Sequence, residues 1–588
     1  MSQTVRSSRR RVTIAMVVVL ALVLVFVVRL VDIQVVHANE LSLQANDARS
    51  ISTTTYGDRG EITDRNGTVL AGTVLRYNIT AAPKYAVDHK VTAKDGTVST
   101  ETVKDDMAKV AAATGGDVDT MMAALEANKT ADFAYLVKGV DVTAYRAVVK
   151  LGISYVYTER QTARTYPNGA VAGNLTGFVG TDGAQAGLEL EYDKCLAGQN
   201  GSQTYERGAD GVKLPGSTVT TTKAVAGGTL KTTLDENLQF LVQQDLATEA
   251  QKLGAVSATA VVMKSGDASL LAVADYPSVD PNDVSATNVA NLGSKAFTDL
   301  YEPGSTFKGM TAASLIDAGL ASPSTQATVP DRRVFSFGGS VSDAETHPVE
   351  HLTLAGVLAD SSNVGITLLG DRMTPQKRYE YMLKFGLGRK TEVNFPGEPT
   401  AALKPASQWD AQTDENSMFG QGVAATAIQT ASIYQTIANG GVREPVKLVE
   451  SCTTSDGKVI DKPSTTGTRV VSKTAADDVV KMLENTIPEG TLKGLTPISG
   501  YNISAKTGTA QVADAPNGGY GSDYIVSVAG IAPSENPQYV VLVTFTKPTT
   551  LKTSFAAGPA FREIMSQVLE NYRVTPSTTP AANIPDTW

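Results

Sequence analysis

A serine lies three residues before a lysine, directly after a Pro-Gly pair, in the stretch YEPGSTFKGM. A serine hydroxyl is a poor nucleophile unless a nearby base takes its proton. A lysine amine can act as that base when it is neutral, and burial or a second nearby cation favours the neutral form. Residues i and i+3 of a helix share one face. We therefore expect Ser305 at a helix N-terminus, with Lys308 beside it as the base.

This spacing alone is weak, because Ser-x-x-Lys is short enough to occur by chance. A second copy runs from Ser455 to Lys458, but its central Asp-Gly predicts a turn that would separate the two side chains. The stretch PGSTVT, which begins at Pro215, repeats the loop without the lysine. Neither copy is a candidate site.

Two further segments carry residues that could complete such a site. SSNVG begins at Ser361 and places Asn363 after a predicted helix, LTLAGVLAD. SAKTGTA contains Lys506, Thr507, Gly508 and Thr509 and leads into a predicted hairpin. On a strand, the threonines would alternate with Lys506 and supply hydroxyls near its cation. Gly508 has no Cβ and would allow a substrate backbone to approach closely.

An α+β domain over residues 228–573 is predicted to hold these segments. Asp235 is a typical N-cap of a helix that stops at Gly254. The apolar runs ATAVVM and ASLLAVA predict one hairpin, and YIVSVAGI and YVVLVTF predict a second one before a final helix. We expect one antiparallel sheet with strands from both ends of the domain, flanked by helices, and a mostly helical lobe over residues 305–441.

Other regions are predicted to be non-catalytic. Residues 50–217 contain short strand-like pieces broken by turn dipeptides, which predict an extended, mostly β module with helices near 102–114 and 118–128. Residues 574–588 are rich in Pro, Thr, Ser and Ala without periodicity, which predicts a disordered tail.

The N-terminus carries a predicted membrane anchor. Residues 12–31 are almost entirely apolar and follow four arginines in residues 1–11. The uncharged run is longer than the core of a cleaved signal peptide, so a retained transmembrane helix is favoured over that alternative. The arginines would stay in the cytoplasm, and the rest of the chain would be extracytoplasmic. The net charge of −9 argues against broad nucleic-acid binding.

The two cysteines, Cys195 and Cys452, lie far apart in the sequence. They could pair outside the cell or remain free, and the sequence does not decide between these alternatives.

The order Ser-x-x-Lys, Ser-x-Asn, Lys-Thr-Gly resembles the penicillin-binding proteins and serine β-lactamases. Four other stretches resemble the class B penicillin-binding proteins in particular: RGEITDRNGTVLA (59–71), GLELEYDKCLAG (187–198), YPSVDPND (276–283) and MFGQGVAATAIQTASIYQTIANGG (418–441). YEPGSTFK and SSNVG are more similar to the division-specific FtsI branch than to the elongation branch. The resemblance covers most of the chain from residue 59 to about residue 572.

This resemblance implies a peptidoglycan D,D-transpeptidase with the penicillin-binding/β-lactamase-like fold. Ser305 would attack the penultimate D-Ala carbonyl of a D-Ala-D-Ala stem peptide and form an acyl-enzyme. Lys308 would take the serine proton, and Ser361 would relay a proton to the leaving amine. Asn363 would hold Lys308 and the substrate amide.

The third segment would bind the substrate. Lys506, Thr507 and Thr509 would hold the terminal carboxylate, and the charge of Lys506 would keep Lys308 neutral. Backbone N–H groups of Ser305 and Thr509 would form the oxyanion hole. The resemblance implies no metal or organic cofactor, β-lactams as inhibitors, an FtsW-type glycan polymerase and division proteins as partners, and a position at the division septum.

Three alternatives compete with this interpretation. A D,D-carboxypeptidase or β-lactamase would use water to resolve the same acyl-enzyme, and a non-catalytic sensor or scaffold would only bind. The sequence HPVEH, from His347 to His351, has the spelling of a zinc motif, but Pro348 disfavours the helix that the motif needs, so we expect a surface loop. The charged residues Arg59, Glu61, Asp64 and Arg65 are interpreted as a structural cluster rather than as a surface that packs near a polymerase partner.

Overall fold

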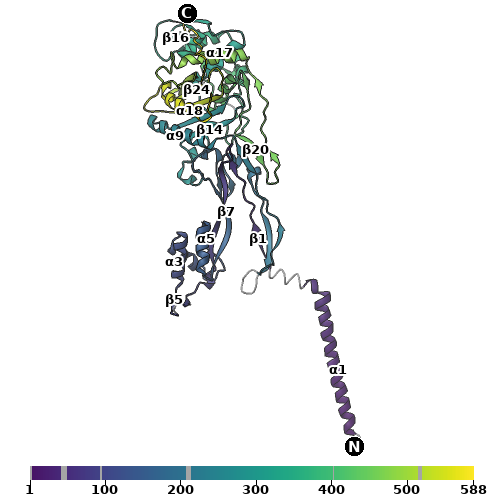
Figure 1. Cartoon of the computed structure of the whole chain (residues 1–588). Helices are drawn as coiled ribbons and strands as arrows, with labels where there is room; N and C mark the ends of the chain where they lie inside the picture. Colours follow the sequence, from purple (N-terminus) through teal and green to yellow (C-terminus); the bar gives the residue numbers. More distant parts are fainter. Residues whose placement is uncertain (1–2, 41–49, 93–95, 207–213, 401–402, 514–519) are drawn as a thin grey trace. The chain divides into compact units, whose positions relative to one another are not determined.

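The computed structural model describes residues 3–40, 50–92, 96–206, 214–400, 403–513 and 520–588 (Figure 1). The chain divides into two compact units, of which one comprises Met1–Asp58 with Gly198–Ala226, and the other Arg59–Ala197 with Gly227–Trp588. The predicted module over residues 50–217 is therefore shared between the two units. The reason is strand pairing. The strand at residues 50–55 pairs with the strand at 201–206, whereas the strand at 62–63 pairs with a strand of the C-terminal domain at 229–232.

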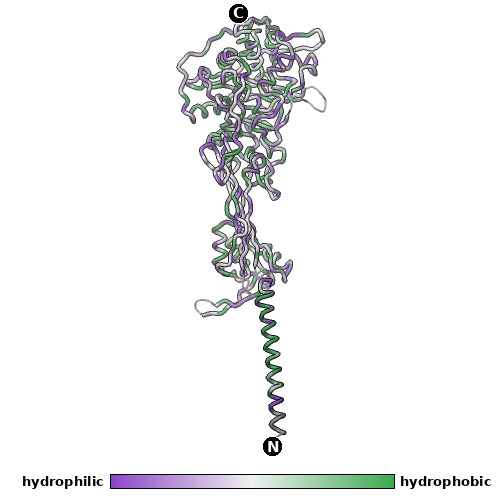
Figure 2. Tube along the Cα trace, turned by 90° about the vertical axis from the view of Figure 1, so that its right-hand side faces the viewer, coloured by the Kyte–Doolittle hydropathy of each residue, from purple (hydrophilic) through white to green (hydrophobic). Residues whose placement is uncertain are grey.

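The first unit begins with the long helix α1 (Gln3–Val31), which continues into a π-helical turn at Asp32–Val36. Its apolar side chains are exposed from Val12 onward, and Figure 2 shows the continuous hydrophobic colouring of this helix. The segment Arg9–Val36 is long and apolar enough to cross a membrane, and it contains the predicted anchor.

The rest of the first unit is an antiparallel sheet in the order β1-β10-β11. Its strands are β1 (Ser50–Thr55), β10 (Gly201–Glu206) and β11 (Val219–Thr222).

Residues 59–197 of the second unit contain a small α/β layer. The antiparallel strands are β3 (Val69–Ala81), β6 (Ala134–Val140) and β7 (Val156–Thr165). The helices are α3 (Val103–Thr114), α4 (Val118–Glu126) and α5 (Val142–Leu151). The first two helices are those predicted. The third was missed, although it begins after an Asp141 cap and ends at Gly152 in the left-handed conformation.

A mixed sheet joins this layer to the C-terminal domain. Strand β2 (Ile62–Thr63) pairs with β3 and also, in parallel, with β12 (Thr229–Thr232), which pairs with β20 (Val449–Thr453). A disulfide between Cys195 and Cys452 also connects the α/β layer to the C-terminal domain. The two cysteines are therefore paired, which the sequence alone did not decide.

The centre of the C-terminal domain is a five-stranded, fully antiparallel sheet in the order β14-β13-β25-β24-β23. Its strands are β13 (Ser257–Lys264), β14 (Leu270–Tyr276), β23 (Ser504–Ala513), β24 (Tyr520–Ala532) and β25 (Tyr539–Thr546). This arrangement confirms the predicted α+β fold with strands from both ends of the domain. The segment with Lys506 lies on β23, at one edge of the sheet.

Helices cover both faces of this sheet. Helices α9 (Glu236–Leu253) and α18 (Gly558–Asn571) pack on one face (Figure 1), and α16 (Ala427–Ala438) packs on the other. Helix α11 (Lys308–Asp317) packs against α16 and α17 (Lys473–Leu483). Strands β13, β14 and β25 are largely apolar on both faces, as expected for strands between two layers. The start and end of α9 are as predicted, because Asp235 accepts a hydrogen bond from the Leu238 N–H at 3.3 Å and Gly254 adopts a φ of 61°.

The lobe on the second face is mostly helical, as predicted, but it also contains two small hairpin-like sheets. Its helices include α12 (Leu354–Ala359), α13 (Asn363–Gly370), α14 (Pro375–Lys384), α15 (Ala411–Asn416) and, further along the chain, α17 (Lys473–Leu483). The sheets pair β15 (Gln326–Val329) with β18 (Glu350–Thr353), and β16 (Arg332–Val334) with β17 (Ser340–Ser342).

Residues 574–588, which we call the C-terminal strap, differ from the expectation of a disordered tail. The Ser577 N–H donates to the Gly500 carbonyl at 2.8 Å, and the Trp588 N–H donates to the His351 carbonyl at 3.1 Å. The composition of this segment does exclude a regular helix. It does not exclude an extended path whose backbone groups bond to the domain surface.

Candidate active site

Ser305 lies in a 3₁₀ turn, Gly304–Phe307, and α11 begins only at Lys308. Ser305 therefore lies at the N-terminal end of a helical segment, as predicted, but in a 3₁₀ turn that leads into α11. The consequence for the side chains is similar to that in an α-helix, since residues i and i+3 of a 3₁₀ turn are aligned along its axis. Ser305 is half-buried, and within the described part of the chain its hydroxyl has no hydrogen-bond partner, so it can meet a substrate.

The backbone around Ser305 is packed against two neighbouring segments. A Cβ on Gly420 would lie 2.3 Å from the Gly304 carbonyl oxygen, and a Cβ on Gly304 would lie 3.0 Å from the Thr509 carbonyl oxygen. Gly304 also has a φ of +56°, a conformation that side chains other than glycine rarely adopt. The turn is therefore held directly beside strand β23.

Ser361 brings two of the predicted segments together. Helix α12 ends at Ala359, and Ser361 follows with a φ of 62°, which is unusual for a residue other than glycine. The Lys308 Nζ contacts the Ser361 carbonyl and lies 3.3 Å from its Oγ. The Lys506 Nζ donates to the same Oγ at 2.8 Å. One hydroxyl therefore lies between two lysine amines from different segments.

Both amines are fully buried, and burial lowers both pKa values. The pKa of Lys308 is well below its ordinary value, because of burial and then the nearby charge of Lys506, whereas Asp343 acts in the opposite direction. Burial lowers the pKa of Lys506 to about 7, against the influence of Asp360. A lowered lysine pKa favours the neutral amine, which is the form that can accept a proton from serine.

Asn363 lies in the same region but has another partner. Its Nδ2 donates to the Ser342 carbonyl at 3.0 Å, while the hydrogen bonds of Lys308 go to Ser361. The predicted contact between Asn363 and Lys308 is therefore not the arrangement in this structure.

The segment that the sequence predicts to bind substrate lies on β23, an edge strand of the sheet. The Lys506 Nζ lies 3.4 Å from the Thr507 Oγ1, which in turn lies 2.7 Å from the Thr491 Oγ1. Thr507 is buried and Thr509 is half-buried. An edge strand can pair with an extended peptide through its unpaired backbone groups.

Gly508 is required by packing within the chain. A Cβ at this position would lie 2.4 Å from the Ser527 Oγ and 2.9 Å from the Pro303 carbonyl oxygen. The glycine is therefore needed where β23 passes the turn that carries Ser305. Close approach of a substrate at Gly508 stays a prediction.

Two carboxylates that the sequence analysis did not single out hold the loops of this site. Asp343 accepts hydrogen bonds from the Ser362 hydroxyl at 2.7 Å and from the Asn363 N–H at 2.5 Å. Glu302 accepts from the Gly422 N–H at 3.0 Å and from the Tyr520 hydroxyl at 2.9 Å. Asp343 is part of no short motif. Glu302 directly precedes the Pro-Gly pair, but no spacing rule marks it.

The zinc-like spelling HPVEH is not helical in the structure. His347 precedes strand β18, and its Nε2 lies 3.1 Å from an Asp343 oxygen. His351 belongs to β18 and its ring contacts Trp588. The two imidazoles make separate contacts, and the end of the motif lies on a strand rather than in the predicted surface loop.

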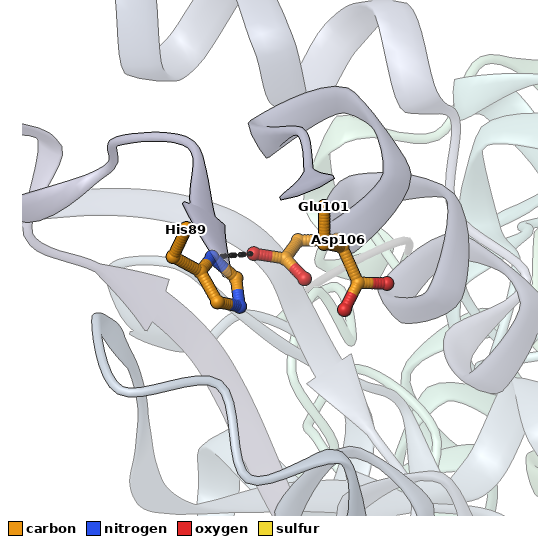
Figure 3. A group of neighbouring side chains, drawn as sticks. All are labelled: His89, Glu101 and Asp106. Carbon is orange, nitrogen blue, oxygen red and sulfur yellow. Dashed lines mark ion pairs between the residues drawn. The ribbon is translucent and has the colours of Figure 1, made fainter. Parts of the chain in front are cut away.

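Another group of possible metal ligands lies in the α/β layer. His89 of β4 (His89–Thr92), Glu101 of β5 (Val98–Glu101) and Asp106 of α3 point toward one another (Figure 3). Each has a partner within the chain: Asp106 accepts from the Tyr155 hydroxyl at 2.8 Å and lies 3.7 Å from His89, and Glu101 pairs with Lys109. These interactions account for the group without an ion.

Arg59 belongs to a structural ion-pair cluster, but its partners are not the predicted neighbours. Glu61 is exposed, and Asp64 and Arg65 make other contacts. Arg59 donates to Glu189 and to Asp193 at 2.6 Å each, and Arg164 donates to the other Glu189 oxygen at 2.6 Å. Glu189 is fully buried. A buried carboxylate requires such pairing.

Two family models match this chain. The penicillin binding protein transpeptidase domain matches residues 258–566, and the penicillin-binding protein dimerisation domain matches residues 54–232.

Known proteins resemble the chain over most of its length. The penicillin-binding protein PbpB of Mycolicibacterium smegmatis is 34% identical, with 96% of this chain and 90% of the relative covered. The peptidoglycan D,D-transpeptidase FtsI of Escherichia coli is 30% identical, with 93% of this chain and 89% of the relative covered. The crystal structure of penicillin binding protein 3 of Mycobacterium tuberculosis complexed with aztreonam is 28% identical, covers 91% of this chain and all of the other, and has a TM-score of 0.68.

Proposed function

Because this chain belongs to the class B penicillin-binding proteins, which are serine-type peptidoglycan transpeptidases, we propose that it cross-links stem peptides through an acyl-enzyme on Ser305. The observation that carries this proposal is the position of the Ser361 Oγ, 2.8 Å from the Lys506 Nζ and 3.3 Å from the Lys308 Nζ. In this arrangement Lys308, Ser361 and Lys506, which come from three distant segments, meet beside the turn that carries Ser305.

The first half-reaction forms the acyl-enzyme. Neutral Lys308 takes the Ser305 proton as the oxygen attacks the carbonyl carbon of the penultimate D-Ala. The C–N bond to the terminal D-Ala then breaks, and its amine receives a proton through Ser361. Burial of Lys308 supports its role as the base, since it keeps the amine unprotonated.

Substrate is held along β23. Lys506, Thr507 and Thr509 bind the terminal carboxylate, and the N–H groups of Ser305 and Thr509 stabilise the developing oxyanion. The close packing of Gly304 against Thr509 supports this assignment, because it places the two backbones side by side.

The second half-reaction completes the cross-link. The amine of a neighbouring stem peptide attacks the ester carbonyl, a new amide bond forms, and Ser305 regains its proton. A β-lactam would acylate Ser305 in the same way as the stem peptide.

Labelled penicillin tests the nucleophile. We expect wild type to become labelled and Ser305→Ala to remain unlabelled. Ser455→Ala is the matched control, since this serine has the same spacing to a lysine but lies in a turn, and it should be labelled like wild type. Labelling of Ser305→Ala would refute the proposed nucleophile.

Product analysis tests the reaction class. Lipid-linked peptidoglycan, supplied together with a glycan polymerase, should yield cross-linked peptide dimers. Release of D-Ala without dimers would identify a carboxypeptidase, and labelling by penicillin without any turnover would identify a sensor or scaffold.

We further propose that α1 anchors the enzyme with its N-terminus in the cytoplasm and the catalytic domain outside, at the division septum, beside an FtsW-type polymerase. The arginines before the apolar segment support this orientation. A fluorescent fusion should concentrate at the septum, and depletion should block division and produce elongated or unseparated cells. A uniform envelope signal with normal division would refute the septal role.

A further inference from the structure

The C-terminal strap contacts the helix that presents Ser361. The Thr353 N–H donates to the Asp586 carbonyl at 2.9 Å, and the Thr353 hydroxyl donates to the Pro585 carbonyl at 2.7 Å. Thr353 is the N-cap of α12, whose other end leads to Ser361. A Cβ on Gly356 would lie 2.0 Å from the Asp586 carbonyl oxygen, so the strap passes directly against the helix.

The strap is also bound to the segment that follows α17. The Asn485 Nδ2 donates to the Ile584 carbonyl at 2.8 Å and to the Asp586 Oδ1 at 2.7 Å. The Ala582 N–H donates to Glu484 at 2.5 Å. Asn485 and Glu484 are both buried, and Ile584 packs against the main core.

That same segment contacts the end of α12, which precedes Ser361, and the motif segment on β23. The Thr491 N–H donates to the Ala359 carbonyl at 3.1 Å, at the end of α12. The Thr491 hydroxyl lies 2.7 Å from the Thr507 hydroxyl on β23. The strap thus fixes the beginning of α12. Thr491 fixes its end, and Thr491 belongs to the same segment as Glu484 and Asn485, which bind the strap.

Ser361 needs such support because of its backbone conformation. A residue other than glycine with a φ of 62° stays there only when its surroundings determine its position. Catalytic groups also require close positioning by the residues behind them.

We propose that the C-terminal strap positions Ser361 between Lys308 and Lys506, with Asp586 and Asn485 as its main positioning residues. The strap touches neither lysine. It acts by fixing α12 and the segment around Thr491, and so it supports acylation of Ser305 from outside the active site. This inference rests on the proposed function.

A variant of the whole protein that lacks the residues after Ala582 tests the proposal. A chain that ends at Ala582 loses the contacts with Thr353 and Asn485 but retains those of Ser577. At temperatures well below its melting temperature, we expect it to be acylated by labelled penicillin at a rate reduced roughly tenfold or more, because small misplacements of reacting groups are costly. Ser577→Ala is the matched control, since its hydroxyl accepts from the Asn502 N–H at the opposite end of the strap. It should keep the wild-type rate.

The pH profile separates positioning from mere stabilisation. If Ser361 moves, water reaches Lys308 and the pKa of this lysine rises toward its ordinary value. Lys506 on β23 and Asp343 after β17 are the charged groups that face it, and both remain in the truncated chain. The low-pH limb of acylation should therefore move to higher pH. A strap that only stabilises the fold would leave the rate and this limb unchanged, and that result would overturn the proposal.

Two further comparisons make the test decisive. If the truncated chain does not fold, Asp586→Ala replaces it in the test. We expect this variant to have a lower acylation rate than wild type and a low-pH limb at higher pH. If wild type itself is not acylated, the proposed function fails, whereas the strap is judged only by the ratio of variant to wild-type rates.

Discussion

At the scale of single residues, the structure explains how a lysine can be a base near neutral pH. Lys308 is buried and close to a second cation, and both factors oppose its protonation. Lys506 is buried as well, but its proposed task is the opposite one, because it must be charged to bind a carboxylate. The two amines should therefore dominate opposite limbs of the pH dependence.

The first prediction is a bell-shaped pH profile for the second-order rate of acylation. The rate should rise with pH as Lys308 loses its proton. It should fall as pH increases through the pKa of Lys506, about 7, because the carboxylate loses its cation. Stopped-flow acylation measurements between pH 5 and 9 would resolve both limbs.

Lys506→Arg is the matched variant for this profile. Arginine keeps its charge throughout this range, so the high-pH limb should disappear while the low-pH limb remains. An unchanged high-pH limb in this variant would assign that limb to another group.

The three motif segments were predictable from the sequence because each depends on a few residue types at fixed spacing. Asp343 was not predictable, since it contacts Ser362 and Asn363 from 19 and 20 residues away without any motif. The conformation of Ser361 was equally hidden, because a positive φ at serine has no sequence signature.

At the scale of elements, the site depends on the contact between the Ser305 turn and β23. Gly508 allows this contact, since a side chain there would meet Ser527 and Pro303. Helix α9 and both hairpins were predicted correctly because caps, turns and apolar runs are local signals. The strap was not, because its order comes from distant partners such as Asn485.

The second prediction concerns Gly508→Ala. The added methyl group must displace Ser527 or the backbone at Pro303, which should lower the free energy of unfolding by about 1–3 kcal/mol and reduce the acylation rate. Urea unfolding and labelled-penicillin kinetics would measure the two effects.

Gly266→Ala provides the control, because the structure shows open space where its Cβ would lie, in the turn between β13 and β14. This variant should match wild type in both measurements. Equal behaviour of the two alanine variants would show that the contact at Gly508 is unimportant.

At the scale of the whole molecule, the disulfide connects residues 59–197 to the C-terminal domain. Cys195 and Cys452 are separated by 257 residues in the sequence and are both buried. A cross-link of this kind stabilises the fold mainly by restricting the unfolded chain.

The third prediction is that replacing both cysteines by serine lowers the free energy of unfolding by about 2–4 kcal/mol. Chemical unfolding with and without a reductant would measure this difference. The reductant should destabilise wild type and leave the double variant unaffected. The same response of both proteins to the reductant would show that the bond does not form in the native protein.

The acylation rate of Lys308→Ala tests the central claim most directly, namely that one buried amine activates Ser305 where the three segments meet. We expect an unchanged circular dichroism spectrum and an acylation rate lower by roughly 10² to 10⁴, with no recovery at high pH. Acylation at the wild-type rate in a folded Lys308→Ala protein would contradict the account.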